Sequence, residues 1–309
     1  MKKHLLTLYT RTPLHVGCGT SVDVVDLPIM RERITGFPVI PSTSLKGVLL
    51  QAAREKWGDP REKTPPPEAR LLFGTADEER QNEHGETEKF SYAGCVQIIE
   101  AKLLAFPVRS LAGCFAWLTC PAVLRRFQRD TGISINIPPK LDTEHVIAGS
   151  DLLVPGRNQV VLEEYALSLQ PTTASTAAAE TAKGMHKLTM DSLWQEELGK
   201  RLAIVHDENF QHFVTSCTEV VARIAINPGT RTNTGGALFN QENVPCEALF
   251  YSVLHVLPSR KPGSNGDPDQ CLADLLAGAK VIQIGGDETT GHGLCELNHQ
   301  LLDNNKETR

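Results

Sequence analysis

The chain has 309 residues, of which 40% are hydrophobic and 22% are charged, a composition that is ordinary for a globular protein with a large core. No run approaches the ~20 apolar residues of a membrane span, and the first residues lack the apolar stretch and cleavage site of a signal peptide. The formal net charge of −6 argues against a broadly basic nucleic-acid-binding surface, although residues 1–60 carry eight Lys and Arg against five Asp and Glu. The eight cysteines are scattered without a C-x-x-C pair, so we expect reduced thiols in a cytoplasmic protein and no zinc site.

The N-terminal segment predicts a strand over residues 4–10, a loop over 11–26, a short strand over 37–40 and then a helix. The helix has apolar residues at helical spacing on one face: Leu45, Val48, Leu49, Ala52, Ala53 and Trp57. Ser42 or Ser44 can cap its first amides, and those amides, the helix dipole and Lys46 form a candidate phosphate site. Serine-capped helices with an early lysine are common and usually bind nothing, so the residues alone leave both interpretations open.

The middle of the chain is less regular. Residues 58–92 form a polar insertion with three consecutive prolines and a highly charged run. Strands are expected over 93–106 and 114–120, followed by a helix over 121–129 that starts at a proline. Within the irregular residues 130–192 we expect one strand over 160–169, and the Thr/Ala-rich residues 172–184 stay unassigned.

The last third predicts helices over 193–202, 207–217 and 270–277, with strands over 219–226, 246–256 and 280–284. An arm of residues 227–245, rich in glycine and asparagine, joins two of these strands and has too few apolar residues to be stable alone. It is either a floppy loop or a segment that a partner orders. Arg231 and Phe239 give it one charge for a phosphate and one aromatic ring for a base.

These elements predict an α+β fold with a ferredoxin-like core, in which two βαβ halves form an antiparallel sheet backed by helices. We expect one elaborated domain with a core of about 1–57, 93–129, 219–226 and 246–297. Residues 58–92 and 130–218 are its insertions, and 227–245 is the arm. No repeat of 20–50 residues is present, so a solenoid is not expected.

Two further stretches are candidate sites. The loop 285–293 contains Gly285, Gly286, Gly291 and Gly293, whose backbone can approach a phosphate closely, but it matches neither a P-loop nor G-x-G-x-x-G. It is equally compatible with a tight connection between strands.

Asp26, five residues before Arg31, is a candidate catalytic carboxylate, although most aspartates in such places form turns or solvated ion pairs. Asp23 is nearly as good a candidate, and His15 lies close by in sequence. Lys46 and Arg109 are either phosphate ligands or ordinary surface charges.

The segment P-V-I-P-S-T-S-L-K-G at 38–47 resembles the signature of the RAMP superfamily, and V-V-D-L-P-I-M-R-E-R-I-T-G-F-P at 24–38 narrows the resemblance. Together they look like the backbone subunits of type III-B (Cmr) CRISPR complexes. Further matching blocks lie in the same order along the chain, at 105–113, 121–130, 160–166, 219–227, 234–239 and 282–293.

The resemblance implies an RNA-recognition-like palm with inserted fingers and a β-hairpin thumb at 227–245. Copies of such a subunit polymerise head to tail on crRNA with other Cmr subunits, without a membrane, and cleave complementary target RNA. It places the catalytic role on Asp26 and phosphate binding on Ser44, Lys46 and the four loop glycines. The residues themselves add His15 as a candidate catalytic support, and Arg109 and Arg231 as candidate RNA ligands.

Because aspartate, with an ordinary pKa near ~3.9, is a poor base at neutral pH, we favour Asp26 as a ligand of Mg²⁺ (or Mn²⁺) or as a group that orients the attacking hydroxyl. A direct general-base role comes second. The alternative function is an architectural crRNA-binding subunit that does not cut.

Overall fold

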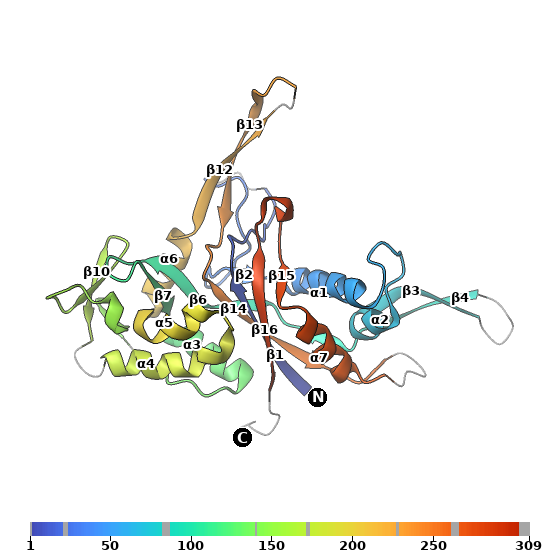
Figure 1. Cartoon of the computed structure of the whole chain (residues 1–309), viewed down its shortest axis with the longest axis horizontal. Coiled ribbons are helices and arrows are strands. Elements are labelled where there is room, and N and C mark those ends of the chain that lie inside the picture. Colours follow the sequence, from blue (N-terminus) through green and yellow to red (C-terminus); the bar gives the residue numbers. More distant parts are fainter. Residues whose placement is uncertain are drawn as a thin grey trace.

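The computed structural model describes residues 2–20, 24–81, 87–139, 141–170, 174–226, 229–260 and 266–302. One large sheet runs through the molecule, helices pack against it, and two hairpins project from the body (Figure 1). None of the helices in these ranges is long and apolar enough to cross a lipid bilayer.

The centre of the sheet is built from two β-helix-β units. In the first, β1 leads through α1 to β6, with bounds Lys2–Thr10, Ser42–Trp57 and Ala101–Arg109. In the second, β14 leads through α7 to β16, with bounds Leu249–Val256, Pro268–Gly278 and Leu294–Leu302. The four strands lie in the order β16-β1-β14-β6, and every neighbouring pair is antiparallel. The expected α+β class is therefore confirmed, and β16 is a central strand that the sequence analysis missed.

Short strands complete this half of the sheet: β2 (Val39–Ile40) beside β6, β5 (Val96–Ile98) beside β14, and β15 (Val281–Gln283) at the edge beside β16. The strand expected over 93–106 is thus divided between β5 and β6. Helix α1 buries the apolar face expected of it and packs against α7 and against α2 (Pro67–Phe73). From the sequence these residues were expected to belong to a polar insertion, yet α2 buries Ala69 and Leu72.

The sheet continues beyond β6 through one strand that was expected in the core and four strands that lie in residues 130–218, which were expected to be an insertion. The added strands are, in spatial order, β7 (Phe115–Thr119), β11 (Leu202–Val205), β8 (His145–Ala148), β10 (Tyr165–Leu169) and β9 (Gln159–Leu162). Two pairs in this half, β7 with β11 and β8 with β10, are parallel, so the sheet as a whole is mixed and not purely antiparallel. The single strand expected over 160–169 is a hairpin that turns at Glu163, where φ is +47°.

Four helices lie in this half: α3 (Pro121–Thr131), α4 (Ala174–Met185), α5 (Ser192–Arg201) and α6 (Asp207–Ser216). Three-residue 3₁₀ turns occur at Ser150–Leu152, His186–Leu188 and Glu288–Thr290. Helix α4 covers most of the stretch that the sequence left unassigned, and it packs on α5 and β8.

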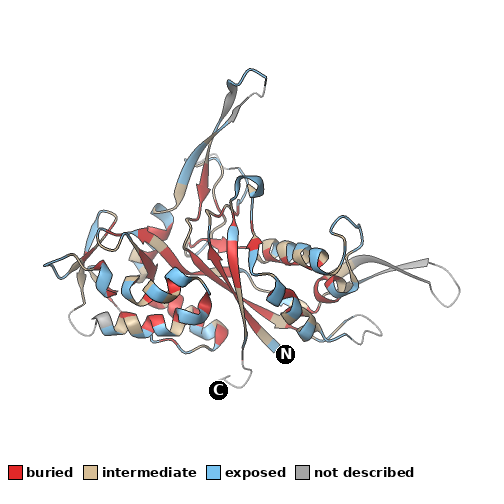
Figure 2. Ribbon diagram, in the orientation of Figure 1, coloured by how far each residue is buried: buried red, intermediate tan, exposed pale blue. Residues whose placement is uncertain are grey.

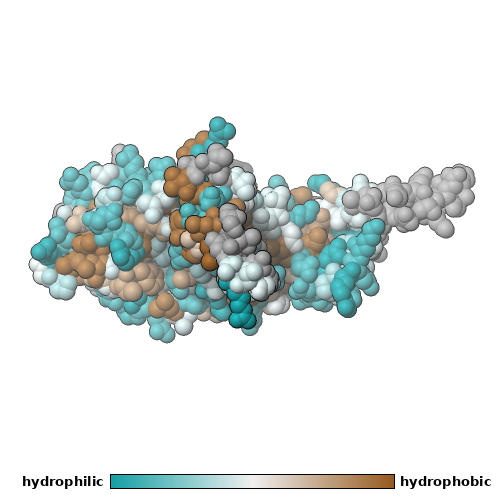
Figure 3. Space-filling model, turned by 90° about the horizontal axis from the view of Figure 1, so that it is seen from above, coloured by the Kyte–Doolittle hydropathy of each residue, from teal (hydrophilic) through white to brown (hydrophobic). Residues whose placement is uncertain are grey.

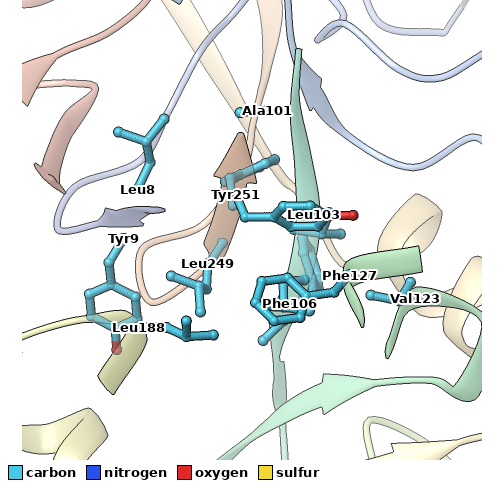
Figure 4. Packing of buried hydrophobic residues seen from close by; sticks show 14 of the residues in the cluster. Leu8, Tyr9, Ala101, Leu103, Phe106, Val123, Phe127, Leu188, Leu249 and Tyr251 are labelled. Atoms are coloured by element: carbon cyan, nitrogen blue, oxygen red, sulfur yellow. The ribbon is translucent and has the colours of Figure 1, made fainter. Parts of the chain in front are cut away.

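The core follows the sheet from end to end, as the burial colours show (Figure 2). Phe127 of α3 packs edge-on against Tyr251 of β14 with ring centroids 4.9 Å apart, beside Phe106 and Leu249 (Figure 4). In the other half, Trp194 contacts both Tyr9 and Trp117 edge-on. Burying one such side chain contributes about 1.5–3 kcal/mol, so this continuous core supplies the main stabilisation.

Two hairpins stand apart from the sheet. One is formed by β3 (Gly74–Gln81) and β4 (Thr87–Ala93). The other is formed by β12 (Glu219–Ile226) and β13 (Asn233–Asn243), which pair with each other and extend away from the body (Figure 1). We call residues 219–243 the projecting hairpin. The sequence placed 219–226 in the core and confined the expected β-hairpin thumb to 227–245, whereas in the structure 219–226 is itself one of the two strands of the hairpin.

Candidate functional site

The loop that carries Asp26 runs along the base of the projecting hairpin. The backbones of Leu14 and Val244 exchange hydrogen bonds of 2.8 and 2.9 Å. Further along, the Leu27 amide donates to the Asn240 carbonyl and the Glu242 amide donates to the Leu27 carbonyl, both at 3.0 Å. The loop is therefore fixed by main-chain hydrogen bonds at two places, to β13 and to the residue that follows it.

Asp26 itself lies exposed at this junction. Its Oδ2 accepts a hydrogen bond of 2.7 Å from the backbone amide of Asn240. One carboxylate oxygen is thus held by β13 while the residue stays accessible to a bound molecule. Asp23, the alternative candidate, lies outside the described residues.

Glu242 is a buried carboxylate that the sequence analysis did not single out. It is 7% exposed and accepts hydrogen bonds from the Ile29 amide (3.0 Å), the Thr218 hydroxyl (2.8 Å) and the Arg31 guanidinium (2.5 Å). Buried carboxylates of this kind are stable only when they are well satisfied. Glu242 therefore joins the Asp26 loop, the start of β12 and β13 in one network. The sequence signal for an acidic partner here is the pair Arg31 and Arg33 on either side of Glu32. This pair does not reveal that Arg31 binds Glu242.

His15 lies between the same strand and the glycine loop. Its Nδ1 is 2.7 Å from the Glu242 carbonyl oxygen, and its own carbonyl accepts a hydrogen bond of 2.9 Å from the Gly286 amide. Gly285 has a φ of +84°, and a Cβ there would lie 2.1 Å from the His15 carbonyl oxygen. The glycine at 285 is therefore required by the close approach of these two segments.

Several amides of the glycine loop already donate to protein carbonyls. Gly286 donates to His15 and Gly293 to Pro13, while the amides of residues 290–292 donate to carbonyls within the loop. A phosphate would have to be bound by the remaining groups of the loop. The loop's phosphate-binding role stays a prediction, whereas its packing against the segment before Asp26 is observed.

The glycine loop also contacts the other face of the hairpin. Asp287 places Oδ1 at 3.1 Å from an Arg223 guanidinium nitrogen and accepts a hydrogen bond of 2.7 Å at Oδ2 from the Gln241 side chain. His292 Nε2 lies 3.3 Å from Arg223. The base of the projecting hairpin is therefore held between the Asp26 loop and the glycine loop.

The N-terminus of α1, the helix that carries Ser44 and Lys46, differs from the predicted one. Helix α1 begins at Ser42 with Pro41 as its N-cap, and no side chain caps its first amides. The expected serine cap is thus wrong, because a proline side chain has no acceptor. Lys46 is exposed and lines a cavity of about 680 Å³ together with Tyr92 and Arg260.

Two other candidate RNA ligands lie on separate elements. Arg109, at the end of β6, is 76% exposed and forms an ion pair of 2.8 Å with Glu163. Arg231 is an exposed residue near the outer turn of the projecting hairpin, with a φ of +55°. The described contacts bring together Asp26, His15 and the glycine loop around β13, but they do not join Ser44, Lys46, Arg109 or Arg231 to that group.

Among the described residues there is no cluster of three or more His, Cys, Asp or Glu side chains arranged to hold a metal ion. All eight cysteines are free thiols. Asp26 alone is compatible with the mode in which Mg²⁺ takes one or two carboxylates from the protein and its other ligands from substrate phosphates and water.

Comparison with known protein families shows the superfamily of this chain. The RAMP superfamily model matches residues 7–296, and the chain belongs to that superfamily. It is 37% identical to the CRISPR system Cmr endoribonuclease Cmr4 of Pyrococcus furiosus, over 99% of this chain and 98% of that protein. Within the superfamily it is therefore a member of the Cmr4 family.

Solved structures agree with this placement. A crystal structure of oligomeric Cmr4 from Pyrococcus furiosus superposes with a TM-score of 0.69 at 30% identity, covering 98% of this chain and all of that one. A chain of the type III-B Cmr-beta complex bound to cognate target RNA superposes with a TM-score of 0.70, covering 96% of each chain. At 20% identity the second likeness shows the fold alone.

Proposed function

We propose that this chain is a backbone subunit of a type III-B CRISPR effector that lies in several copies along crRNA and cleaves complementary target RNA at regular intervals. The endoribonuclease name of the 37% identical relative supports the activity. The observation that carries the proposal is the exposed Asp26 carboxylate, held by the Asn240 amide at the base of the projecting hairpin.

In this proposal the four central strands and their two helices form a ferredoxin-like palm. The insertions serve as fingers and the projecting hairpin as the thumb. Base pairing between guide and target reads the sequence, so the protein needs to grip only backbone and shape. This requirement is compatible with a net charge of −6, since local groups such as Lys46, Arg109 and Arg231 and the glycine loop can contact phosphates without a broadly basic surface.

The chemistry that fits this arrangement is transesterification. The 2′-oxygen of the target attacks the adjacent phosphorus and the bond to the 5′-oxygen breaks, which leaves a 2′,3′-cyclic phosphate and a 5′-hydroxyl. The proton of the 2′-hydroxyl is lost and the leaving oxygen gains one. Holding the attacking oxygen in line supplies much of the rate, and a hairpin that separates neighbouring nucleotides would favour that alignment.

In this proposal Asp26 orients the attacking hydroxyl. One of its oxygens is fixed by β13, so the carboxylate has a defined position from which to accept the 2′-hydroxyl hydrogen bond. A bound Mg²⁺ or Mn²⁺ would add stabilisation of the charge that develops on the phosphate and the leaving oxygen. Half-buried His15 lies in the segment before Asp26 and contacts β13, where it supports the loop through the Glu242 carbonyl.

The test is cleavage of matched RNA by the assembled complex. We expect evenly spaced products with Mg²⁺ or Mn²⁺, none with EDTA, and a loss of at least ~100-fold in rate for Asp26→Asn, the order expected for loss of a group that acts on the transferred proton. Assembly and target affinity should be retained, because the substitution keeps the size of the side chain and removes only its charge.

Asp23→Asn is the matched control, since it removes the same charge from the same loop and should cut normally. Normal cutting by Asp26→Asn would move the role to Asp23, His15 or another subunit. A wild-type complex that binds target but forms no products would instead support the architectural function.

A further inference from the structure

The two faces of the projecting hairpin contact different loops at its base. Side chains alternate between the faces of a strand, and the contacts follow that alternation. Glu242 is bound to the Asp26 loop, whereas Gln241, the residue before it, is bound to the glycine loop. Arg223 on β12 shares the glycine-loop face with Gln241.

Asp287 is the residue of the glycine loop that makes these contacts. Its two oxygens bind two strands of the hairpin, Oδ1 to Arg223 on β12 and Oδ2 to Gln241 on β13. The Gln241 side chain is 2% exposed and also donates to Asn243 at 3.0 Å. The side chains of the ion pair are 21% and 29% exposed, so the pair is more shielded from water than an ordinary surface pair.

The backbone around Asp287 is itself held in place. Asp287 has a φ of +64° and a ψ of +30°, a left-handed conformation that aspartate and asparagine tolerate better than most residues. Its carbonyl accepts hydrogen bonds from the amides of Thr290 and His292, at 3.0 and 3.2 Å. Since the same loop donates from Gly286 to His15, the carboxylate is fixed relative to the segment that leads to Asp26.

We propose that Asp287 is a positioning residue that sets the angle of the projecting hairpin relative to the Asp26 loop. In the described chain β12 and β13 pair with each other and with no other named strand, and the Asp26 loop adds a single bridge to β13, between Leu27 and Gln241. Side-chain contacts at the base therefore help to fix the direction of the hairpin. The hairpin is long compared with its base, and a small rotation at Arg223 and Gln241 therefore displaces the outer part by a larger distance. Cleavage geometry is sensitive to displacements of ~1 Å.

The consequence for cleavage rests on the proposed function. If the glycine loop binds the guide and the hairpin separates target nucleotides, Asp287 connects the two at the place where the target must meet Asp26. The Asp287 carboxylate is engaged by Arg223 and Gln241, so in this proposal it contacts neither the reacting atoms nor the guide, although other groups of its loop contact the guide. Its loss should affect the rate of cutting and leave the affinity for RNA unchanged.

The variant that tests this is Asp287→Asn in the full chain. Asparagine tolerates the left-handed backbone and can still accept from Gln241, but it lacks the charge that holds Arg223. Glu288→Gln is the matched control, because it removes the same charge from the next residue, which is exposed.

In the assembled complex with saturating target we expect Asp287→Asn to cut roughly tenfold more slowly, the size of losing a charged hydrogen-bond partner. The affinities for guide and target should stay within about twofold, because the residue contacts neither RNA. Arg223→Gln should show the same loss, and the double variant should be no slower than either single variant, since both remove one interaction. Arg223→Lys should recover part of the rate, because it restores a cation.

A second measurement does not depend on cleavage. In the isolated full chain, backbone amides at the hairpin base (residues 221–224 and 238–243) should exchange with solvent several-fold faster in Asp287→Asn. The melting temperature should stay near that of wild type, since the core is untouched. A merely structural role would move the melting temperature and not the exchange at this one place.

Wild-type cutting and wild-type exchange in Asp287→Asn would overturn the proposal. So would an equal effect from Glu288→Gln, additive losses in the double variant, or a loss of cutting that matches a loss of guide affinity. If the wild-type complex does not cut at all, the proposed function fails, while the exchange measurement still decides whether Asp287 positions the hairpin.

Discussion

The central sheet and the projecting hairpin are both made of antiparallel strands, but they are stabilised in different ways. In β14, Phe250 and Leu254 are fully buried because neighbouring strands and helices cover them. In the hairpin, Ile224 and Leu238 stand opposite each other and remain 52% and 64% exposed. Seen from above, hydrophobic residues gather at the hairpin's position (Figure 3).

The difference shows where stability and placement come from. The sheet gains its stability from apolar burial, which is strong and has no preferred direction. The hairpin has little burial of its own, so its base is held by directed polar contacts through Glu242, Arg223, Gln241 and Asp287. Such contacts contribute less energy than a core but fix an orientation. Asp26, the candidate cleavage residue, lies at the base of the hairpin, in the region whose orientation these polar contacts fix.

Substituting a core side chain of the sheet should have the largest effect on stability. We expect Phe250→Ala to lower the free energy of unfolding by about 3–5 kcal/mol, because it leaves a cavity where neighbours cannot fully collapse. Urea unfolding of the full chain measures this. Val281→Ala on the exposed edge strand β15 is the control and should stay within about 0.5 kcal/mol. A small loss for Phe250→Ala would mean that the sheet is less tightly packed than the structure shows.

Acidification should weaken the sheet at the end of β1 and β16 where His4 and His299 stack. Burial, and then the charge of the neighbouring His4, lowers the pKa of His299 from its ordinary 6.5 to about 4. Between those two pH values the unfolded chain binds a proton at this site that the folded chain does not. The free energy of unfolding should therefore fall as the pH drops from 6.5 to 4, by at most about 3 kcal/mol from this residue.

Chemical unfolding at a series of pH values measures that slope. His299→Gln keeps a hydrogen-bonding side chain without the titration, so it should flatten the curve in this window while other acidic transitions remain. An unchanged slope in the variant would show that His299 is not the source.

The glycine loop between the two regions should show an intermediate effect. Gly285→Ala places a Cβ 2.1 Å from the His15 carbonyl oxygen at a positive φ, and we expect it to cost about 2 kcal/mol of stability through the strain it introduces. At Gly286 the nearest atom to a new Cβ is 3.8 Å away, so Gly286→Ala should be nearly neutral. Equal stabilities for the two variants would contradict the close packing of the loop on His15.

The sequence predicted those elements whose structure is determined by residues within the same segment. Helix α1 and the strands β1 and β14 carry strong periodic or apolar patterns, and they form where expected. Strand β16 was missed because its nine residues include Glu296, Asn298, His299 and Gln300, which read as loop. In the folded chain Glu296 is buried and bonded to Arg11 and Thr189, partners far away in sequence. No local pattern reveals such a partner.

The same reasoning applies to the site. Asp26 and the glycine loop were singled out as separate stretches, because each has its own motif or turn chemistry, and His15 was named only because it lies near Asp26 in sequence. Glu242, Gln241 and Arg223 were not found, since they lie in strands whose pairing alone brings them to these loops. For the same reason, β12 was assigned to the core while β13 was assigned to the arm. Strand pairing, unlike helix periodicity, is decided by contacts distant in sequence.

The smallest effect on stability is expected at the exposed apolar face of the hairpin. Ile224→Thr and Leu238→Thr keep β-compatible side chains, and because the positions face solvent we expect changes within about 0.5 kcal/mol in the free energy of unfolding. If RNA or another copy covers this face in the assembled complex, the same substitutions should weaken assembly although the isolated chain is unchanged. Urea unfolding of the isolated chain and sedimentation of the assembled complex separate the two. Destabilisation of the isolated chain by more than about 1 kcal/mol would instead show that the hairpin packs against the body of the same chain. An apolar side chain contributes that much to the free energy of unfolding only when it is buried within the chain.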